Sequence, residues 1–552
     1  MAAGPESPWR EAETVASTLE RGTRERDASP LDVVVLGGSF SGASTAILLK
    51  RWLPWARILL VESSSKFDQK VGEATVELSG LFLLRALGCW DLLSREHLPK
   101  HGLRYWTTDA DHRSLAELSE MGPASQPELP SFQLDRAKLD ESLLQRAVAA
   151  GCELLRPARV VDVEVATELG QETRVLLEGA GVEHAVRTRW VVDATGRHGF
   201  LSKKLGLREK LAAHPTTAYW GRWDGVKDLD GPELVDLDGT DPTKLPPVAC
   251  SRRLATNHFL GHGWWSWVIP LSSGQTSIGI VHDERYFDLP GSGSLRPRYE
   301  EFVRTAPGLR ELVDGATPDE ADFRTYRHLP YRATQYMGPG WALVGDAAAF
   351  MDPYYSPGLD HCSFSVYATA RLIQEALSHE LLGDGLQAAI DRHNGAFQRS
   401  YDRLFDSLYK DKYEIFGDAE LLTTAFHLDT GMYYLGVIQP AYRDIEELRW
   451  PVLGRDIWQA EWAYKTLRFF HRRIVHHARV RRERGLYGRR SAGWRNMEFR
   501  FGLGRGAIYP MAMGLWRLLG LEVSSLLARF RAPGGVHAKP ASELARDETR
   551  SA

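Results

Sequence analysis

Residues Leu31-Asp-Val-Val-Val-Leu36 lead directly into Gly37-Gly38-Ser39-Phe40-Ser41-Gly42. The β-branched run suits a fully buried parallel strand, and a helix-forming stretch follows the glycines. In a G-x-G-x-x-G turn the first glycine makes the tight turn, the second lets backbone approach a pyrophosphate, and the third permits close packing of strand and helix. Gly37 and Gly42 take the outer positions and Ser39 the middle one. The stretch therefore predicts a dinucleotide-binding turn.

A second strand and an acidic side chain support this prediction. Arg57-Ile-Leu-Leu-Val-Glu62 ends, 25 residues after Gly37, in a carboxylate that can accept hydrogen bonds from the ribose hydroxyls of an adenosine. An acid at this position disfavours a 2′-phosphate. The alternative is a structural turn in another kind of α/β unit. The order of strand, helix, strand and acid favours a doubly wound parallel sheet of the Rossmann type.

Size and composition narrow the class of protein. The 552 residues exceed one ordinary domain, and the formal net charge of −4 indicates no partner by itself. The four cysteines lack metal-ligand or CxxC spacing, so we expect no metal site, no disulfide framework and a cytoplasmic location. Residues 1–30 and 532–552 are polar and are expected to be a disordered lead-in and tail. We expect no signal peptide and no membrane span.

Three later segments resemble the FAD-binding hydroxylases in sequence and in order. They are Phe132-Gln-Leu-Asp-Arg136, Trp190-Val-Val-Asp-Ala-Thr-Gly-Arg197 and Trp341-Ala-Leu-Val-Gly-Asp-Ala-Ala-Ala-Phe-Met-Asp-Pro353. The resemblance implies FAD as the cofactor, with Arg136 at its phosphate or ribitol. It also implies Asp193 in a turn on the adenosine side, and Gly345 and Asp346 beside a ribitol hydroxyl. A helix beginning after this last segment would place its positive end toward the flavin.

The segment Gly263-Trp-Trp-Ser-Trp-Val-Ile-Pro270 contains W-x-W-x-I-P, which resembles the signature of the flavin-dependent halogenases. The resemblance implies that Trp265, Trp267 and Pro270 separate the flavin from the organic substrate. A small halide, instead of the substrate, then reaches the flavin hydroperoxide. The alternative is that these indoles, at alternate positions on a strand, fill a core between sheet and helices.

Two further segments resemble the same family, Val71-Gly-Glu-Ala-Thr-Val76 and His97-Leu-Pro-Lys-His-Gly-Leu-Arg-Tyr-Trp106. The resemblance implies that Lys100 is the catalytic residue, which holds hypohalous acid and presents it to an aromatic ring. Burial of a lysine favours its neutral amine. The alternative is a solvated surface lysine.

The segment Asp352-Pro-Tyr-Tyr-Ser-Pro-Gly-Leu-Asp360 departs from the halogenase pattern, which usually has a serine or threonine pair before the glycine. In the family, backbone N–H groups of this loop hold the halide beside the flavin, a role that here falls to Gly358 and Leu359. Pro357 has no N–H, and a lost hydrogen bond to an anion costs about 1.5 to 3 kcal/mol. We call residues 352–360, which include Pro353 and Ser356, the halide loop. Its sequence does not decide whether the protein uses a halide.

The chain is expected to form two main parts. Residues 31–380 are predicted to be an FAD-binding and substrate-sheet module with an inserted antiparallel sheet at about 205–335. Residues 381–531 are predicted to be a mainly helical lid over the substrate. The basic segment 468–505 holds 12 arginines and two glutamates. It is expected to contact a membrane surface or an acidic carrier protein, or else to form internal ion pairs, and no nucleic acid is expected.

The resemblance implies a halogenase that uses reduced FAD, dioxygen and chloride or bromide on an electron-rich aromatic substrate, phenolic or pyrrolic, free or carrier-bound. A separate flavin reductase is expected, because a single dinucleotide turn is visible. One alternative is an FAD-dependent monooxygenase that uses no halide. Another is a flavin-binding module without catalysis, docked on a membrane or on a carrier protein.

Overall fold

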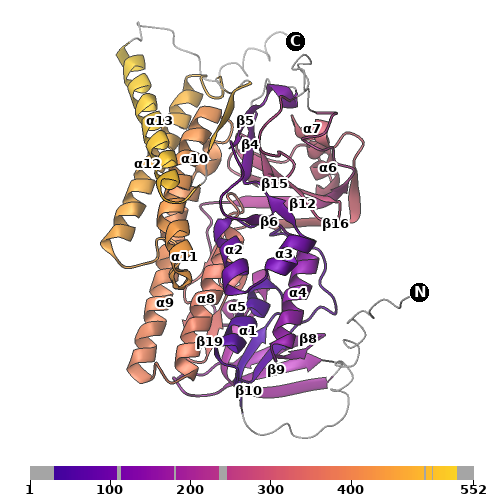
Figure 1. Ribbon diagram of the computed structural model, residues 1–552, viewed down its shortest axis with the longest axis vertical. Coiled ribbons are helices and arrows are strands. Elements are labelled where there is room, and N and C mark those ends of the chain that lie inside the picture. The colour runs from indigo at the N-terminus through magenta and orange to yellow at the C-terminus, as the bar shows by residue number, and fades with distance from the viewer. Residues whose placement is uncertain are drawn as a thin grey trace, which may run out of the picture.

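The computed structural model describes residues 30–108, 114–179, 182–234, 245–489, 491, 493–499 and 502–530. Most of the predicted lead-in and the tail at 532–552 lie outside the described residues. Figure 1 shows a sheet covered by helices in the lower part, a second sheet above it, and the C-terminal helices as a layer along one side of both. This arrangement of a parallel sheet, a second sheet and a helical region is the predicted fold class, which is confirmed.

The first sheet runs in the order β18-β19-β10-β1-β2-β7, and its neighbours from β19 to β7 are parallel. Its strands are β1 (Leu31–Leu36), β2 (Ile58–Val61), β7 (Glu153–Leu155), β10 (Val182–Asp193), β18 (Met337–Gly338) and β19 (Trp341–Leu343). On β10, the antiparallel strands β9 (Thr173–Gly179) and β8 (Ala158–Glu164) extend the sheet. The β-branched run of β1 is buried, as a parallel strand covered on both faces requires.

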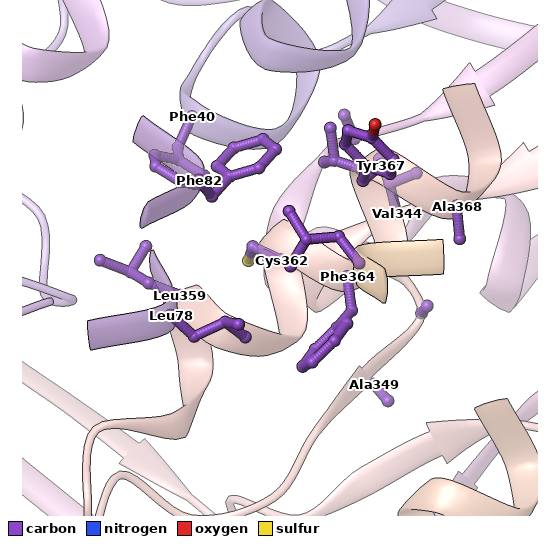
Figure 2. Close-up of a cluster of buried hydrophobic side chains, with 14 of the residues drawn as sticks. Phe40, Leu78, Phe82, Val344, Ala349, Leu359, Cys362, Phe364, Tyr367 and Ala368 are labelled. Atoms are coloured by element: carbon purple, nitrogen blue, oxygen red, sulfur yellow. The ribbon is translucent and has the colours of Figure 1, made fainter. Parts of the chain in front are cut away.

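The helix after the glycine-rich turn packs against the helix that follows the halide loop. Helix α1 (Phe40–Trp52) contacts α8 (Pro357–Leu377) and α4 (Arg136–Ala149). Figure 2 shows Phe40 beside Phe82 of the π-helical turn η3 (Phe82–Ala86), with Leu359 and Cys362 of α8 facing them. This buried cluster fixes the start of α8 relative to the turn after β1.

The second sheet runs in the order β16-β12-β15-β14-β13-β4-β5-β21. Its strands are β4 (Leu103–Thr107), β5 (Ser119–Pro123), β12 (Thr216–Asp224), β13 (Thr256–Gly261), β14 (Trp264–Pro270), β15 (Thr276–Asp283), β16 (Thr317–Arg327) and β21 (Arg495–Phe499). The strands from β16 to β13 are antiparallel and lie in the range expected for the inserted sheet. Strands β4, β5 and β21 extend the sheet beyond that range, since β13 pairs with β4 and β5 pairs with β21, both in parallel.

Shorter elements connect these layers. They are the strands β3 (Leu98–Lys100), β6 (Ser131–Gln133), β11 (Arg208–Lys210), β17 (Tyr331–Ala333) and β20 (Ala349–Phe350), and the helices α2 (Glu77–Leu81), α3 (Trp90–Glu96), α5 (Phe200–Lys204), α6 (Leu295–Thr305) and α7 (Leu309–Leu312). Strand β3 pairs with β6 in antiparallel fashion.

The C-terminal region is mainly helical. Its elements are α9 (Gly383–Leu404), η7 (Phe405–Tyr409), α10 (Ala419–Tyr433), η9 (Tyr434–Ile438), α11 (Gln439–Arg443), α12 (Trp458–Glu483) and α13 (Arg505–Phe530). Among the described helices, none has both the length and the apolar character needed to cross a membrane.

Arginines of the basic segment form ion pairs within the chain. Arg479 lies 2.6 Å from Glu414, Arg481 2.9 Å from Asp418 and Arg473 2.6 Å from Glu522. The alternative of internal ion pairs is therefore confirmed for these arginines. The pairs also tie α12 to its neighbours, because their carboxylates lie on other elements.

Candidate active site

The glycine-rich turn after β1 has the geometry that its sequence predicts. Gly37 has a φ of +97°, and a Cβ there would lie 2.5 Å from the carbonyl oxygen of Ala194. A Cβ on Gly42 would lie 1.8 Å from the carbonyl oxygen of Gly37. Both positions therefore require glycine, the first for the turn and the other for the close approach of α1. Ser39 is the N-cap residue of α1.

Glu62 follows β2 and is directed toward the turn. Its Oε2 accepts a hydrogen bond of 2.7 Å from the amide of Gly38, and its Oε1 accepts one of 2.8 Å from the amide of Ser64. A carboxylate oxygen has two lone pairs, so each oxygen can accept a further hydrogen bond from a ribose hydroxyl. The two amides thus hold the carboxylate in position, and its contact with ribose stays a prediction.

A cavity of about 710 Å³ lies at this edge of the first sheet, and we call it the dinucleotide cavity. Five residues predicted to bind the cofactor line it: Gly37, Ser39, Glu62, Arg136 and Asp346. The cationic side chains in its lining suit a pyrophosphate, and they include Lys70, Arg159, Arg197 and Arg324. The cavity therefore combines an acidic group for ribose with basic groups for phosphate.

Arg136 is the first residue of α4 and is buried in the wall of the dinucleotide cavity. Its guanidinium forms an ion pair with Asp140, at 3.0 Å, and donates to the carbonyl oxygen of Val71, also at 3.0 Å. The charge is thus compensated within the chain, while the side chain faces the region where a phosphate or ribitol is predicted.

Asp193, Gly345, Gly38 and Gly42 are not part of the cavity lining. The buried carboxylate of Asp193 accepts hydrogen bonds from the amides of Thr195, at 2.9 Å, and Leu201, at 2.7 Å. Burial raises its pKa above the ordinary value. Asp193 therefore holds the turn whose neighbouring residues line the cavity.

Gly345 lies between helices α1 and α8. It has a φ of +57°, its amide donates to Ser365 Oγ at 2.8 Å, and a Cβ would meet the Ser41 side chain. The next residue, Asp346, lines the dinucleotide cavity and also the cavity that contains Lys100. Burial raises the pKa of Asp346 to about 6, against the lowering effect of Arg197, Arg136 and Arg208.

A second cavity, of about 480 Å³, contains the predicted lysine, and we call it the Lys100 cavity. Lys100 ends β3, is 3% exposed, and donates a hydrogen bond of 2.7 Å from Nζ to the carbonyl oxygen of Thr75. Burial lowers the pKa of Lys100 to about 8, while the charges of Glu77 and Asp360 act in the opposite direction. The alternative of a solvated surface lysine is therefore wrong.

The halide loop reaches the same cavity. Pro357 and Gly358 line it, and a Cβ on Gly358 would meet no atom within 4 Å. Pro357 occupies the first turn of α8, where its missing N–H leaves no intrahelical bond unmade. Pro353, Ser356 and Leu359 flank these residues without lining either cavity.

Two consecutive residues of the loop have left-handed backbone, Tyr355 with a φ of +71° and Ser356 with a φ of +56°. Such a conformation costs of order 1–3 kcal/mol at each residue without glycine. It is held in place because Tyr355 Oη donates to Asp429 at 2.9 Å and the amide of Tyr354 donates to Asp352 at 2.9 Å. The loop is thus fixed from both sides.

Trp265 and Trp267 lie in β14, buried in the second sheet, and neither lines a cavity. Trp265 Nε1 donates to Tyr413 Oη at 3.0 Å, and its ring centroid lies 5.6 Å from that of Tyr354. Trp267 Nε1 donates to Ser277 Oγ at 3.1 Å. Pro270, the last residue of β14, is partly buried and also outside both linings. Trp265 therefore packs against the halide loop, and Trp267 lies next to Trp265, with ring centroids 5.8 Å apart.

The sequence did not single out two carboxylates of the Lys100 cavity. Asp360 accepts hydrogen bonds from the amide of Ser79, at 3.0 Å, and from Tyr433 Oη, at 2.9 Å. Glu77 accepts one of 2.8 Å from Tyr434 Oη. Burial raises the pKa of Asp360 to about 7. The sequence did offer one signal for Asp360. It is an acidic residue in the first turn of the helix whose N-terminus was predicted to bind halide.

The residues that the structure describes form no His/Cys/Asp/Glu cluster that could hold a metal ion, and their four cysteines are free and buried. The dinucleotide cavity is suited to a dinucleotide, and the Lys100 cavity combines a lysine with several carboxylates, Glu77 and Asp360 among them.

Known proteins are similar to this chain over most of its length. The FAD binding domain model matches residues 30–235. Flavin-dependent halogenase chlA of Dictyostelium discoideum is 25% identical over 447 residues, which are 74% of this chain and 70% of that protein. Tetracycline 7-halogenase of Kitasatospora aureofaciens is 28% identical over 398 residues, 67% of each chain. The 1H-pyrrole-2-carbonyl-(peptidyl-carrier protein) chlorinase of Pseudomonas fluorescens is 25% identical and covers 75% of this chain and 89% of its own.

Solved structures share the fold. The crystal structure of halogenase PltM in complex with phloroglucinol and FAD has a TM-score of 0.66 at 19% identity and covers 89% of this chain and 96% of its own. The chondrochloren halogenase CndH has a TM-score of 0.57 at 20% identity and covers 89% and 97%. The FAD-binding match and the curated relatives support a flavin-dependent halogenase family for this chain, with FAD as the cofactor, and the solved structures share its fold.

Proposed function

We propose that the chain uses reduced FAD, dioxygen and chloride or bromide to place a halogen on an electron-rich aromatic ring, phenolic or pyrrolic. The observation that carries the proposal is that buried Lys100 lines the same cavity as Pro357 and Gly358 of the halide loop. Asp346 lines this cavity and also the dinucleotide cavity. One relative named for a pyrrole-2-carbonyl group and one structural neighbour solved with phloroglucinol support the substrate class.

The dinucleotide cavity fits FAD by the chemistry of its walls. Glu62 would accept from the adenosine ribose, and the cationic side chains at 136, 159 and 197 would face the pyrophosphate. Asp346, at the junction of the cavities, would accept a ribitol hydroxyl. When bound, reduced FAD with dioxygen, a halide and a proton supplies hypohalous acid, leaving oxidised FAD and water.

The start of α8 would hold the halide. The N-terminus of a helix carries a positive partial charge and free N–H groups, both favourable for an anion. Pro357 supplies no donor, so the amides of Gly358 and Leu359 would make the contacts. The fixed halide loop keeps these amides in place, and the buried indoles of Trp265 and Trp267 would keep the organic substrate on the lysine side.

Lys100 would hold and direct the hypohalous acid. One of its three N–H donors goes to Thr75, which leaves two for the oxygen of the acid. When the ring carbon attacks the halogen, the oxygen–halogen bond breaks and the departing hydroxide takes a proton from the ammonium to give water. Asp360, in the same cavity and with a pKa of about 7, would accept the proton that the ring loses.

Oxygen transfer by a monooxygenase is the rival, and Pro357 favours it because the proline removes a donor to halide. Product mass separates the two functions. Protein, reduced flavin and dioxygen are incubated with a phenolic and pyrrolic substrate panel in chloride, in bromide and in halide-free buffer. The proposal predicts a chlorinated product in chloride buffer, a brominated product in bromide buffer, and no halogenated product without halide. A product that gains oxygen in all three buffers would refute it.

The partners follow from this chemistry. We propose a separate flavin reductase as the source of reduced FAD, and a substrate that is either free or carrier-bound. The test is turnover with FAD and NADH, which should require an added flavin reductase. Product formed at the same rate without the reductase would contradict the proposal of a separate one.

Membrane contact through the basic segment is a second candidate partner. It is favoured by exposed aromatic residues on the C-terminal helices, Trp462 at 61% and Trp516 at 75% exposure. Against it, several arginines of the segment are engaged in internal ion pairs. Flotation of the whole chain with vesicles of anionic lipid tests it, and a chain that stays in the dense fraction would exclude this contact.

A further inference from the structure

The Lys100 cavity extends well beyond the groups proposed for the chemistry. Its inner end is formed by buried residues of the FAD-binding part, including Lys100 and Asp352. Its outer part is formed by the C-terminal helices, among them α12, which contributes Ala460, Ala463 and Leu467. Positions 460, 463 and 467 recur every three or four residues, so one face of α12 lines the cavity. An aromatic ring at Lys100 alone would leave this outer part unfilled.

The outer wall of the cavity is mostly apolar. It is formed by Leu404, Leu408, Val437, Ala441, Val452 and the α12 face. Two charged side chains belong to the outer part, Arg455 and Glu447, and they form an ion pair with each other at 2.5 Å. A ligand along this wall would therefore gain chiefly from burying apolar surface.

The outer end of the cavity opens to solvent. Trp450 and Ile457, which line it, are 38% and 43% exposed, and Gly436 and Gln459 are exposed as well. The inner end, by contrast, holds Lys100 at 3% exposure. A substrate entering by this opening would pass the apolar wall before its reactive ring reached the lysine.

We propose that the substrate carries a long apolar chain on its electron-rich ring. The ring lies at Lys100, and an alkyl or acyl chain extends along α12 toward Trp450 and Ile457. This inference rests on the proposed function, because it places the reacting ring at the halogenating end of the cavity. A chain of this kind would remove the outer wall from water, which a small free ring cannot do.

A carrier-bound substrate fits the outer wall less well. A phosphopantetheine arm contains two amides, each of which loses free energy when it is buried without hydrogen-bond partners. Of the described residues that form the outer wall, most have hydrocarbon side chains, and Arg455 and Glu447 are paired with each other. The wall therefore favours a hydrocarbon chain over the arm.

Binding by chain length tests the inference without turnover. Calorimetry is run on the whole FAD-loaded chain, oxidised and without halide, with methyl-, pentyl- and nonylresorcinol. The affinity is expected to rise about fourfold for each added methylene, since burial of a methylene contributes about 0.8 kcal/mol. A pantetheine thioester of comparable length should bind more weakly than the nonyl compound. Equal affinity across the series, or tighter binding of the thioester, would overturn the inference.

Variants of the α12 face test where the alkyl chain of the ligand lies. Ala463→Phe and Ala460→Phe narrow the outer part, and both residues are partly buried. Lys465→Phe adds the same ring at an exposed position of the same helix and is the matched control. Each of the two cavity variants should weaken nonylresorcinol at least tenfold and methylresorcinol less than twofold. Folding is checked by the melting temperature, and the second cavity variant replaces the first if that one is unfolded.

The outcomes distinguish this inference from the proposed function. Cavity variants that bind nonylresorcinol as tightly as the unaltered protein does would refute the proposed position of the alkyl chain. So would variants that lower the affinity for both ligands equally. Product mass with methylresorcinol tests halogenation separately. Chain-length-dependent binding without any halogenated product would retain the apolar site and refute the proposed reaction.

Discussion

The Nζ atom of Lys100 donates a hydrogen bond of 2.7 Å to the carbonyl oxygen of Thr75. The bond joins the two segments that resemble the halogenase family outside the W-x-W-x-I-P strand. It satisfies one donor of a buried ammonium, whose burial the nearby carboxylates of Glu77 and Asp360 offset in part. A lysine can therefore remain in the cavity at 3% exposure and still keep donors for a ligand.

Halogenation should depend on the protonation of Lys100. Burial lowers its pKa to about 8, so the ammonium predominates at pH 7 and is lost as the pH rises through about 8. If the ammonium holds the hypohalous acid, the rate of product formation falls above about pH 8. Flavin reoxidation in the same samples is the control and should not follow this fall. A product rate that stays constant from about pH 7 to 9 would contradict the role of the ammonium.

Asp360 should make the stability of the chain depend on pH. Burial raises its pKa from 3.8 to about 7, so the folded state binds a proton that the unfolded state has already lost. This contribution to the free energy of unfolding is present at low pH and is lost as the pH rises through about 7.

The substitution Asp360→Asn should remove that dependence, so its effect on the free energy of unfolding should be about 3 kcal/mol more favourable at pH 8 than at pH 5. Denaturant unfolding of both proteins at pH 5 and pH 8 measures the difference, the pH 5 pair being the control. Asparagine can still accept from the amide of Ser79. Curves that differ equally at both pH values would show that Asp360 does not carry the effect.

Arg136 should serve both the fold and the cofactor, and two variants separate these roles. Arg136→Met leaves the buried carboxylate of Asp140 with only the more distant ammonium of Lys70, at 3.9 Å, at a cost of up to about 3 to 5 kcal/mol of stability. In the double variant Arg136→Met/Asp140→Leu the unpaired charge is gone, so stability should recover. Affinity for FAD, followed by quenching of flavin fluorescence, should stay low in both. Normal FAD binding by the double variant would rule out a contact of Arg136 with the cofactor.

Pro357→Ala should strengthen halide binding. The alanine supplies an N–H at the first turn of α8, and a hydrogen bond to an anion is worth about 1.5 to 3 kcal/mol. The bromide concentration for half-maximal product formation should fall about tenfold or more. Pro353→Ala, which changes a proline outside the cavity lining, is the matched control. An unchanged bromide dependence in Pro357→Ala would show that this position does not face the halide.

The dinucleotide turn could be predicted from the sequence because its requirements are local. Gly37 and Gly42 are needed by backbone geometry within a few residues, and the acid after β2 follows from the order of the elements. Lys100 could be predicted only through the resemblance of its segment to a family. Nothing in its immediate sequence distinguishes it from an exposed lysine.

Long-range pairing explains what the sequence did not predict. The carboxylate of Asp360 is held in the wall of the Lys100 cavity by hydrogen bonds from Ser79 and Tyr433. Both residues are far from Asp360 in the sequence. Likewise, β21 joins the second sheet through a parallel pairing with β5. The alternation of Trp265 and Trp267 predicted a buried strand face, but not that the ring of Trp265 would pack against Tyr354 of the halide loop.

The most direct test of the account compares Lys100→Ala with the unaltered chain in one assay, with reduced FAD, dioxygen, bromide and an electron-rich phenol. Both proteins are loaded with FAD, and the assay records flavin reoxidation together with the mass of the product. The account predicts brominated product from the unaltered chain, and equally fast reoxidation without brominated product from Lys100→Ala. Full bromination by Lys100→Ala would contradict it.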